Sequence, residues 1–112
     1  MAVLQHSITR RNNISTITIG GSLDASSAPA FAQKLEDEIK KGSLVFIISM
    51  EKLDYIASAG MGVLISINEK LVKEKKQLRI CKMNDKIKNI FKMLGFLNLF
   101  KIYKNEEEAE NA

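Results

Sequence analysis

The chain of 112 residues holds very few of the side chains on which metal sites, disulfides and membrane spans depend. Its single cysteine, Cys81, excludes an intramolecular disulfide, and with the single histidine, His6, it falls short of the three or four ligands of a zinc site. We therefore expect no metal, no cofactor and no cysteine hydrolase. The longest apolar run, residues 44–48, is far below the ~20 residues of a membrane span, and the N-terminus lacks the apolar stretch of a signal peptide. These absences predict a cytoplasmic protein without a membrane span.

Hydrophobic residues make up 46% of the chain and charged residues 27%, a balance typical of one compact domain with a single core. The net charge of +4 is spread unevenly. Residues 70–104 hold eleven basic and two acidic residues, whereas residues 105–112 hold four acidic residues and no basic one. A solvated helix surface is the preferred interpretation of the basic segment, because no recognition helix or aromatic RNA-binding motif accompanies it. We expect a domain over residues 1–104, followed by a flexible acidic tail over residues 105–112.

Hydrophobic periodicity divides the chain into strands and helices. Strands are expected at residues 3–9, 14–19, 44–48, 77–81 and 99–103, the first two forming a hairpin that ends at residues 20–22. Helices are expected from a Ser26-Ser27 cap to Gly42, from 59 to 75, and from 85 to 94 after an Asn84 cap. The polar residues 49–55 are expected to be a connection. The order β-β-α-β-α-β-α-β predicts an α/β fold, a mixed sheet of four or five strands with helices packed on it.

The continuously apolar run at residues 44–48 is typical of a central strand buried on both faces. The side chains expected to pack against this sheet recur at helical spacing. They are Phe31, Leu35, Leu64, Ile67, Ile87, Ile90, Phe91 and Leu94.

The segment over residues 56–62 is the one that suggests chemistry. Ser58 lies between Ala57 and Ala59 where a loop enters a helix, and a helix N-terminus offers unpaired N–H groups and a positive dipole to a phosphate. Gly60 and Gly62 are expected to leave the surface bare, with the intervening Met61 at least partly exposed. The segment is neither a phosphate-binding P-loop nor a nucleophile elbow. On chemistry alone, Ser58 is best interpreted as a helix cap.

Three motifs together resemble a family. Residues 21–24 (GSLD), residues 53–64 (LDYIASAGMGVL) and residues 91–96 (FKMLGF) resemble, in order and spacing, the STAS domain of bacterial anti-sigma-factor antagonists. The resemblance covers residues 3–104. It implies binding to an anti-sigma factor that is also a serine kinase, release of a sigma factor, and reversal of the phosphorylation by a phosphatase.

The resemblance implies roles for particular residues. Ser58 corresponds to the serine that the kinase phosphorylates. The implied partner-binding surface comprises Asp24, Ala57, Ala59, Gly60, Met61 and Gly62. The chain would then be a regulatory protein and not an enzyme.

The chain departs from the family pattern at three positions. Ala57 replaces the usual Asp, Ala59 replaces a second Ser or Thr, and Ser49 stands where Asp or Asn often ends the buried strand. An alternative is therefore a non-switching STAS subunit, a structural part of a lipid-transport or stress-signalling assembly. A nucleic-acid binder that uses residues 70–104 is less favoured. An enzyme is least favoured, because Asp24 and Asp54 are better interpreted as exposed loop aspartates than as a catalytic pair.

Overall fold

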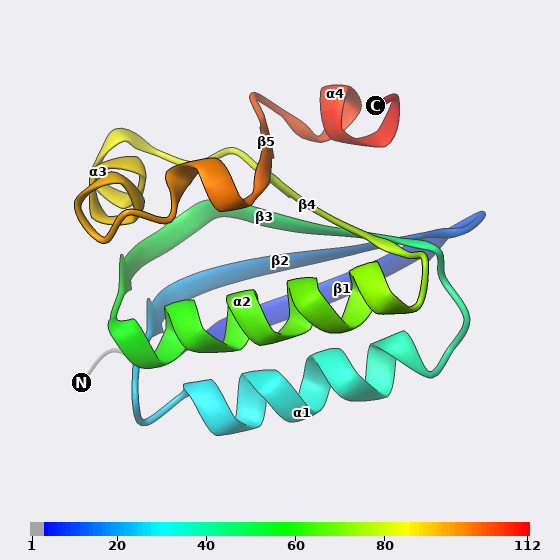
Figure 1. Cartoon of the computed structure of the whole chain (residues 1–112), viewed down its shortest axis with the longest axis horizontal. Helices are drawn as coiled ribbons and strands as arrows, with labels where there is room; N and C mark the ends of the chain where they lie inside the picture. The colour runs from blue at the N-terminus through cyan, green and yellow to red at the C-terminus, as the bar shows by residue number, and fades with distance from the viewer. Residues whose placement is uncertain (1–3) are drawn as a thin grey trace.

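The computed structural model describes residues 4–112 as one five-stranded sheet with helices on both faces (Figure 1). The strands are β1 (Gln5–Arg11), β2 (Ile14–Leu23), β3 (Val45–Ile56), β4 (Gln77–Cys81) and β5 (Lys101–Tyr103). The helices are α1 (Ala28–Ile39), α2 (Ser58–Lys73), α3 (Asp85–Met93) and α4 (Glu106–Glu110), with a 3-10 turn at Leu97–Leu99. The strands follow their sequence order across the sheet, β1–β2 antiparallel and the other pairs parallel. The expected α/β class and element order are confirmed.

The main core lies between the sheet and the helices α1 and α2, which run side by side on one face (Figure 1). Phe46, Ile48 and Met50 of β3 point into it, because side chains alternate along a strand. The expected inward residues of the helices are confirmed as buried, apart from Ile90 on α3 and Leu94 directly after it. Ile90 is only partly buried, and Leu94 is 42% exposed, so its expected inward position is wrong.

Strand β3 occupies the centre of the sheet, as expected, but it is twelve residues long and includes the predicted connection at residues 49–55. Its pairing with β2 is interrupted twice, between Thr18 and Gly20 and between Gly21 and Ser22. Each interruption adds one residue to β3, as in a β-bulge. Strand β2 likewise continues to Leu23, so the expected end of the hairpin at residues 20–22 is wrong.

The C-terminal residues, expected as a tail, include helix α4 on the face of the sheet opposite to α1 and α2 (Figure 1). Its Ala109 is fully buried against Ile47 and Cys81. The guanidinium of Arg79 donates to the Ala109 carbonyl at 2.8 Å, a favourable place for a cation because it lies near the C-terminus of a helix. Arg11 forms a further ion pair with Glu110 at 3.3 Å. A small second core therefore lies under α4.

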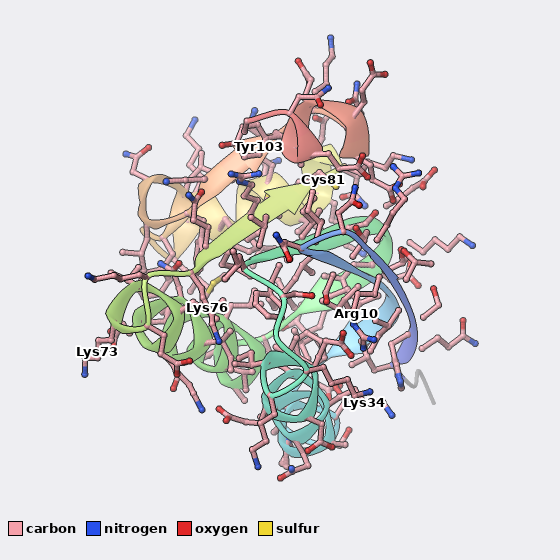
Figure 2. All side chains as sticks on the ribbon, turned by 90° about the vertical axis from the view of Figure 1, so that its right-hand side faces the viewer. Arg10, Lys34, Lys73, Lys76, Cys81 and Tyr103 are labelled. Carbon is pink, nitrogen blue, oxygen red and sulfur yellow. The ribbon has the colours of Figure 1, made fainter. Side chains whose placement is uncertain are left out.

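A buried carboxylate joins α1 to the sheet near the tip of the β1–β2 hairpin. Glu38 is 1% exposed, and its Oε2 accepts hydrogen bonds from Arg10 Nη2 at 2.7 Å and from Ser15 Oγ at 2.9 Å. Figure 2 views the molecule from this end, with Arg10 beside the sheet. Burial alone would raise the pKa of Glu38, but the hydrogen bonds from Arg10 and Ser15, together with the positive charges of Arg10 and Lys41, outweigh it and lower the pKa below its ordinary value. Glu38 is therefore ionised at neutral pH.

Candidate phosphoacceptor and docking site

The site is formed by two loops that meet at one end of the sheet, at the left of Figure 1. One connects β2 to α1 and the other is the junction between β3 and α2. Leu23 pairs with Ile56 at the end of the sheet, and the Ala57 N–H donates to the Leu23 carbonyl at 2.9 Å. The backbone thus places the turn that begins at Asp24 beside the helix that begins at Ser58.

The turn after β2 is closed by its own polar side chains. Asp24 Oδ1 accepts hydrogen bonds from the Ser26 hydroxyl at 2.8 Å and from the backbone N–H groups of Ser26 and Ser27 at 3.0 and 3.2 Å. The bond from the Ser26 hydroxyl is the main cause that lowers the pKa of Asp24. Ser27 Oγ accepts from the Asp24 N–H at 3.0 Å and donates to the Ser22 carbonyl at 2.8 Å. Asp24 therefore orders its own turn, and its carboxylate is engaged there.

Ser58 is the first residue of α2 and is exposed. The residue before it, Ala57, has the extended backbone of an N-cap but carries no side chain that could accept a hydrogen bond. The first hydrogen bond of the helix runs from the Met61 N–H to the Ala57 carbonyl at 3.0 Å. Within residues 4–112, the structure gives the Ser58 hydroxyl no hydrogen-bond partner, and no acidic residue lies in the first turn of α2. Ser58 is therefore not the cap of this helix, contrary to the interpretation from chemistry alone.

Two residues expected at the docking surface lie beneath it instead. Met61 is 1% exposed and belongs to the main core, so its expected exposure is wrong. Gly60 is also buried. A Cβ built on it would lie 2.5 Å from Leu23 Cγ and 2.6 Å from the Leu23 carbonyl oxygen. Gly60 thus permits close packing between the two loops. Gly62 does lie at the surface, with nothing within 4 Å of a Cβ added there.

An apolar groove of about 180 Å³ lies directly beside Ser58, between the β3–α2 junction and α3. Its lining comprises Tyr55, Ile56, Ala57, Ser58, Ile90, Met93 and Leu94. Three of these side chains are large and well exposed, Tyr55 at 46%, Met93 at 85% and Leu94 at 42%. An apolar patch rimmed by polar residues is typical of a surface that binds another protein.

The structure thus brings together Ser58, Ala57, Ala59 and Gly62 at the start of α2, with the Asp24 turn beside them. The groove residues Tyr55 and Met93 were absent from the expected site. The sequence does indicate that Met93 is exposed, because this residue lies outside the apolar stripe that Ile87 and Phe91 form on α3. Tyr55 carried no such signal, since residues 49–55 had been expected to be an irregular connection.

Not all of the eleven basic residues of the segment 70–104 are free at the surface. Arg79 is buried, and Lys70 and Lys82 form ion pairs with Glu36 and Glu51. Within residues 4–112, none of the helices combines the length and the apolar character that crossing a bilayer requires.

Comparison with known proteins identifies the fold as that of a described family. The family model of the STAS domain matches residues 5–109, nearly the whole chain. The chain belongs to the STAS domain family. The match includes both loops of the site and most of α4, so the helix that covers the second core lies within the STAS domain.

Relatives of this STAS domain are named as anti-sigma factor antagonists. One such relative is BtrV of Bordetella bronchiseptica. It is 26% identical over 92 residues, which cover 82% of this chain and 79% of BtrV. The anti-sigma-B factor antagonist of Staphylococcus aureus is 23% identical over 99 residues, which cover 88% of this chain and 92% of that protein.

A solved structure with the same fold is that of the anti-sigma factor antagonist SpoIIAA. Its unphosphorylated form has a TM-score of 0.80 at 18% identity, covering 96% of this chain and 94% of the other. The phosphorylated form, from Bacillus, has a TM-score of 0.72 at 18% identity, covering 96% and 97%.

Proposed function

We propose that this STAS domain is an anti-sigma factor antagonist that a kinase switches off by phosphorylating Ser58. The observation that carries the proposal is the position of Ser58, an exposed hydroxyl at the first residue of an uncapped helix, directly beside an apolar groove. The names of the relatives BtrV and the Staphylococcus aureus protein support the antagonist role. The phosphorylated form of SpoIIAA supports the modification.

The local chemistry of the helix favours a phosphate at this position. The Ser58, Ala59 and Gly60 N–H groups precede the first bonded N–H of α2, that of Met61, and no side chain at Ala57 caps them. A phosphate there adds about 1.5–2 negative charges next to these donors and to the positive end of the helix dipole. Because Ala57 stands where the family pattern has Asp, no side chain at this position competes with a phosphate for the N–H groups at the start of α2. The modified chain remains folded in this account.

The same phosphate would prevent docking. The exposed side chains of Tyr55, Met93 and Leu94 offer the apolar contact that a partner covers. A partner that covers them would have to remove water from a doubly charged group at Ser58, which is unfavourable without a matching cation. In this scheme the chain is the substrate of the anti-sigma factor kinase and not itself an enzyme, and a phosphatase restores binding.

Three variants test the proposal against the anti-sigma factor that co-purifies with the chain from its host. Ser58→Asp is expected to weaken binding at least roughly tenfold, since a charge would be buried against the partner, while the melting temperature holds because Asp is favourable at a helix N-terminus. Ser66→Asp is the matched control, because Ser66 is exposed on the same helix outside the groove lining, and it should bind as wild type does. Ser58→Ala should bind but accept no phosphate.

The two parts of the proposal fail differently. If an anti-sigma factor binds but Ser58→Asp binds as tightly as wild type, and mass spectrometry finds no phosphate after incubation with the kinase, the switch is refuted. If no anti-sigma factor co-purifies, and Tyr55→Ala and Met93→Ala leave all captured proteins unchanged, the antagonist role is refuted.

A further inference from the structure

The sheet has one long open edge that the proposed function does not use. Strand β1 forms this edge with seven residues, almost all of them exposed, and within residues 4–112 it pairs only with β2. The opposite edge, β5, has three residues, and α4 packs against it. The register between β1 and β2 is regular along its full length. Strand β1 therefore presents an ordered row of backbone donors and acceptors to solvent.

The hairpin geometry identifies the backbone groups that face outward. Arg11 pairs with Ile14 across the two-residue turn, and hydrogen-bonded and non-hydrogen-bonded pairs alternate from there along the hairpin. Because a hydrogen-bonded pair closes the turn, the backbone N–H and C=O groups that bond to β2 are those of Arg11, Thr9, Ser7 and Gln5. The N–H and C=O groups of His6, Ile8 and Arg10 then point away from β2, toward solvent.

Within residues 4–112, this edge carries few of the devices by which native proteins protect such strands. It contains no proline, no lysine and no bulge. Its two arginines both form ion pairs within their own chain, Arg10 with Glu38 at 2.7 Å and Arg11 with Glu110 at 3.3 Å. A second strand can therefore approach without meeting an unpaired cation.

We propose that the edge binds a second copy of this chain, β1 against β1 in antiparallel order about a two-fold axis through Ile8. This register is the only one that pairs all seven residues of β1 with one another. It places Ile8 opposite the partner's Ile8, and Ser7 opposite the partner's Thr9. A pair of β-branched side chains and a pair of hydroxyl side chains are both favourable across strands. A shift that centred the contact on Arg10 would pair only residues 9–11 of the two strands and would lose most of the backbone bonds.

A groove next to the edge adds apolar contact to the backbone pairing. It has a volume of about 430 Å³ and lies between β1 and α1. Its lining comprises Leu4, His6, Ser27, Ala30, Phe31, Gln33, Lys34 and Asp37. Its charged residues are Lys34 and Asp37, of opposite sign, so two copies do not repel one another there. Figure 2 shows Lys34 on α1, on the side of that helix next to β1. A partner strand at β1 would form main-chain hydrogen bonds with the edge and would also cover this groove. Main-chain bonds and side-chain pockets are the two kinds of contact by which a strand is added to a sheet.

The mass of the chain in solution tests the dimer. Light scattering after size exclusion, from micromolar to near-millimolar concentration, is expected to show a shift from 12.6 kDa to twice that mass. His6→Pro removes an outward N–H while leaving the bonds to β2 intact, so the monomer should fold, as proline is tolerated on an edge. The dimer should weaken roughly tenfold or more, because two symmetric hydrogen bonds are lost. His6→Ala removes the same side chain from the groove but keeps the N–H, so it is the matched control, and its dimer should be roughly tenfold or more tighter than that of His6→Pro.

A cysteine pair tests the register. In the proposed dimer, cysteines at position 8 face each other across the axis, with Cα atoms about 5.5 Å apart, a separation that a disulfide spans. Position 7 is two residues out of register with its copy, at about 8 Å, which is too far. Ile8→Cys should therefore cross-link under mild oxidation and Ser7→Cys should not. A chain that stays monomeric throughout, a dimer that His6→Pro leaves unchanged, or equal cross-linking of the two cysteine variants would each overturn the proposal.

Discussion

Replacing Gly60 by alanine tests whether the two loops of the site are packed together as the structure shows. The added Cβ would lie 2.5 Å from Leu23 Cγ and 2.6 Å from the Leu23 carbonyl oxygen. The carbonyl belongs to the backbone and accepts the hydrogen bond from the Ala57 N–H, so it cannot move without disturbing the loop. Overpacking costs ~1–3 kcal/mol, and a backbone contact favours the upper value. Because alanine is better than glycine inside a helix by up to ~1 kcal/mol, we expect a net loss of about 2 kcal/mol.

Gly62→Ala is the matched control, since it makes the same change two residues further along the same helix. A Cβ at Gly62 meets nothing within 4 Å, so only the helix-propensity gain of up to ~1 kcal/mol remains. The free energies of unfolding of the two variants, measured by urea denaturation, should therefore differ by about 3 kcal/mol. In a thermal scan, Gly60→Ala should melt roughly 8 °C or more below wild type. If Gly60→Ala were as stable as wild type or as Gly62→Ala, the close contact with Leu23 would be refuted.

Three further predictions concern the buried residues. The ionised Glu38 stabilises the fold above its ordinary pKa of 4.5, and this stability is lost as the pH falls through its lower pKa in the folded protein. Glu38→Gln should therefore lower the free energy of unfolding, measured with urea at pH 7, by about 2–3 kcal/mol. The difference from wild type should shrink below pH ~4.5, and a difference independent of pH would contradict an ionised Glu38. Burial raises the pKa of the Cys81 thiol to about 11, so iodoacetamide at pH 8 should label it only in unfolded protein, and rapid labelling of the native chain would contradict this burial. Met61→Lys buries an unpaired charge and should lower the free energy of unfolding by at least about 3 kcal/mol, whereas a normal melting temperature would place Met61 at the surface.

The succession of elements could be predicted because most of them carry a single regular period. The apolar positions of α1 and α3 recur at helical spacing, and Asn84 caps α3 as expected, its side chain accepting from the Ile87 N–H at 2.8 Å. Strand β4 has the predicted bounds. In these segments local preference and tertiary packing agree.

The second half of β3 could not be predicted, because the two bulges shift its side chains from one face to the other. Its buried residues there are Met50, Leu53 and Ile56, three residues apart, which is not the period of two by which a strand is recognised. For the same reason, the sequence did not predict that Tyr55 lines the groove.

The site residues Gly60 and Met61 were misplaced because a sequence shows only that a glycine has no side chain. It does not show whether the space is left to solvent or filled by Leu23. Met61 lies three residues before Leu64 and six before Ile67, on the face of α2 that points to the core. The position of Ser58 at the start of α2, by contrast, followed from the resemblance to the family and from the start of the helical pattern. Helix α4 was missed because its sequence is mainly acidic and only one of its residues, Ala109, is buried.

The bond between Ala57 and Leu23 and the tight fit of Gly60 have a consequence for the speed and cost of signalling. They hold the Asp24 turn and the start of α2 in one arrangement before any partner arrives, so association orders few groups on this side of the contact. In the switch proposed above, a phosphate on Ser58 would then act by its charge alone and would require no loop to refold. The response time of the proposed switch would be the turnover time of the kinase and the phosphatase, with no slower conformational step added to it.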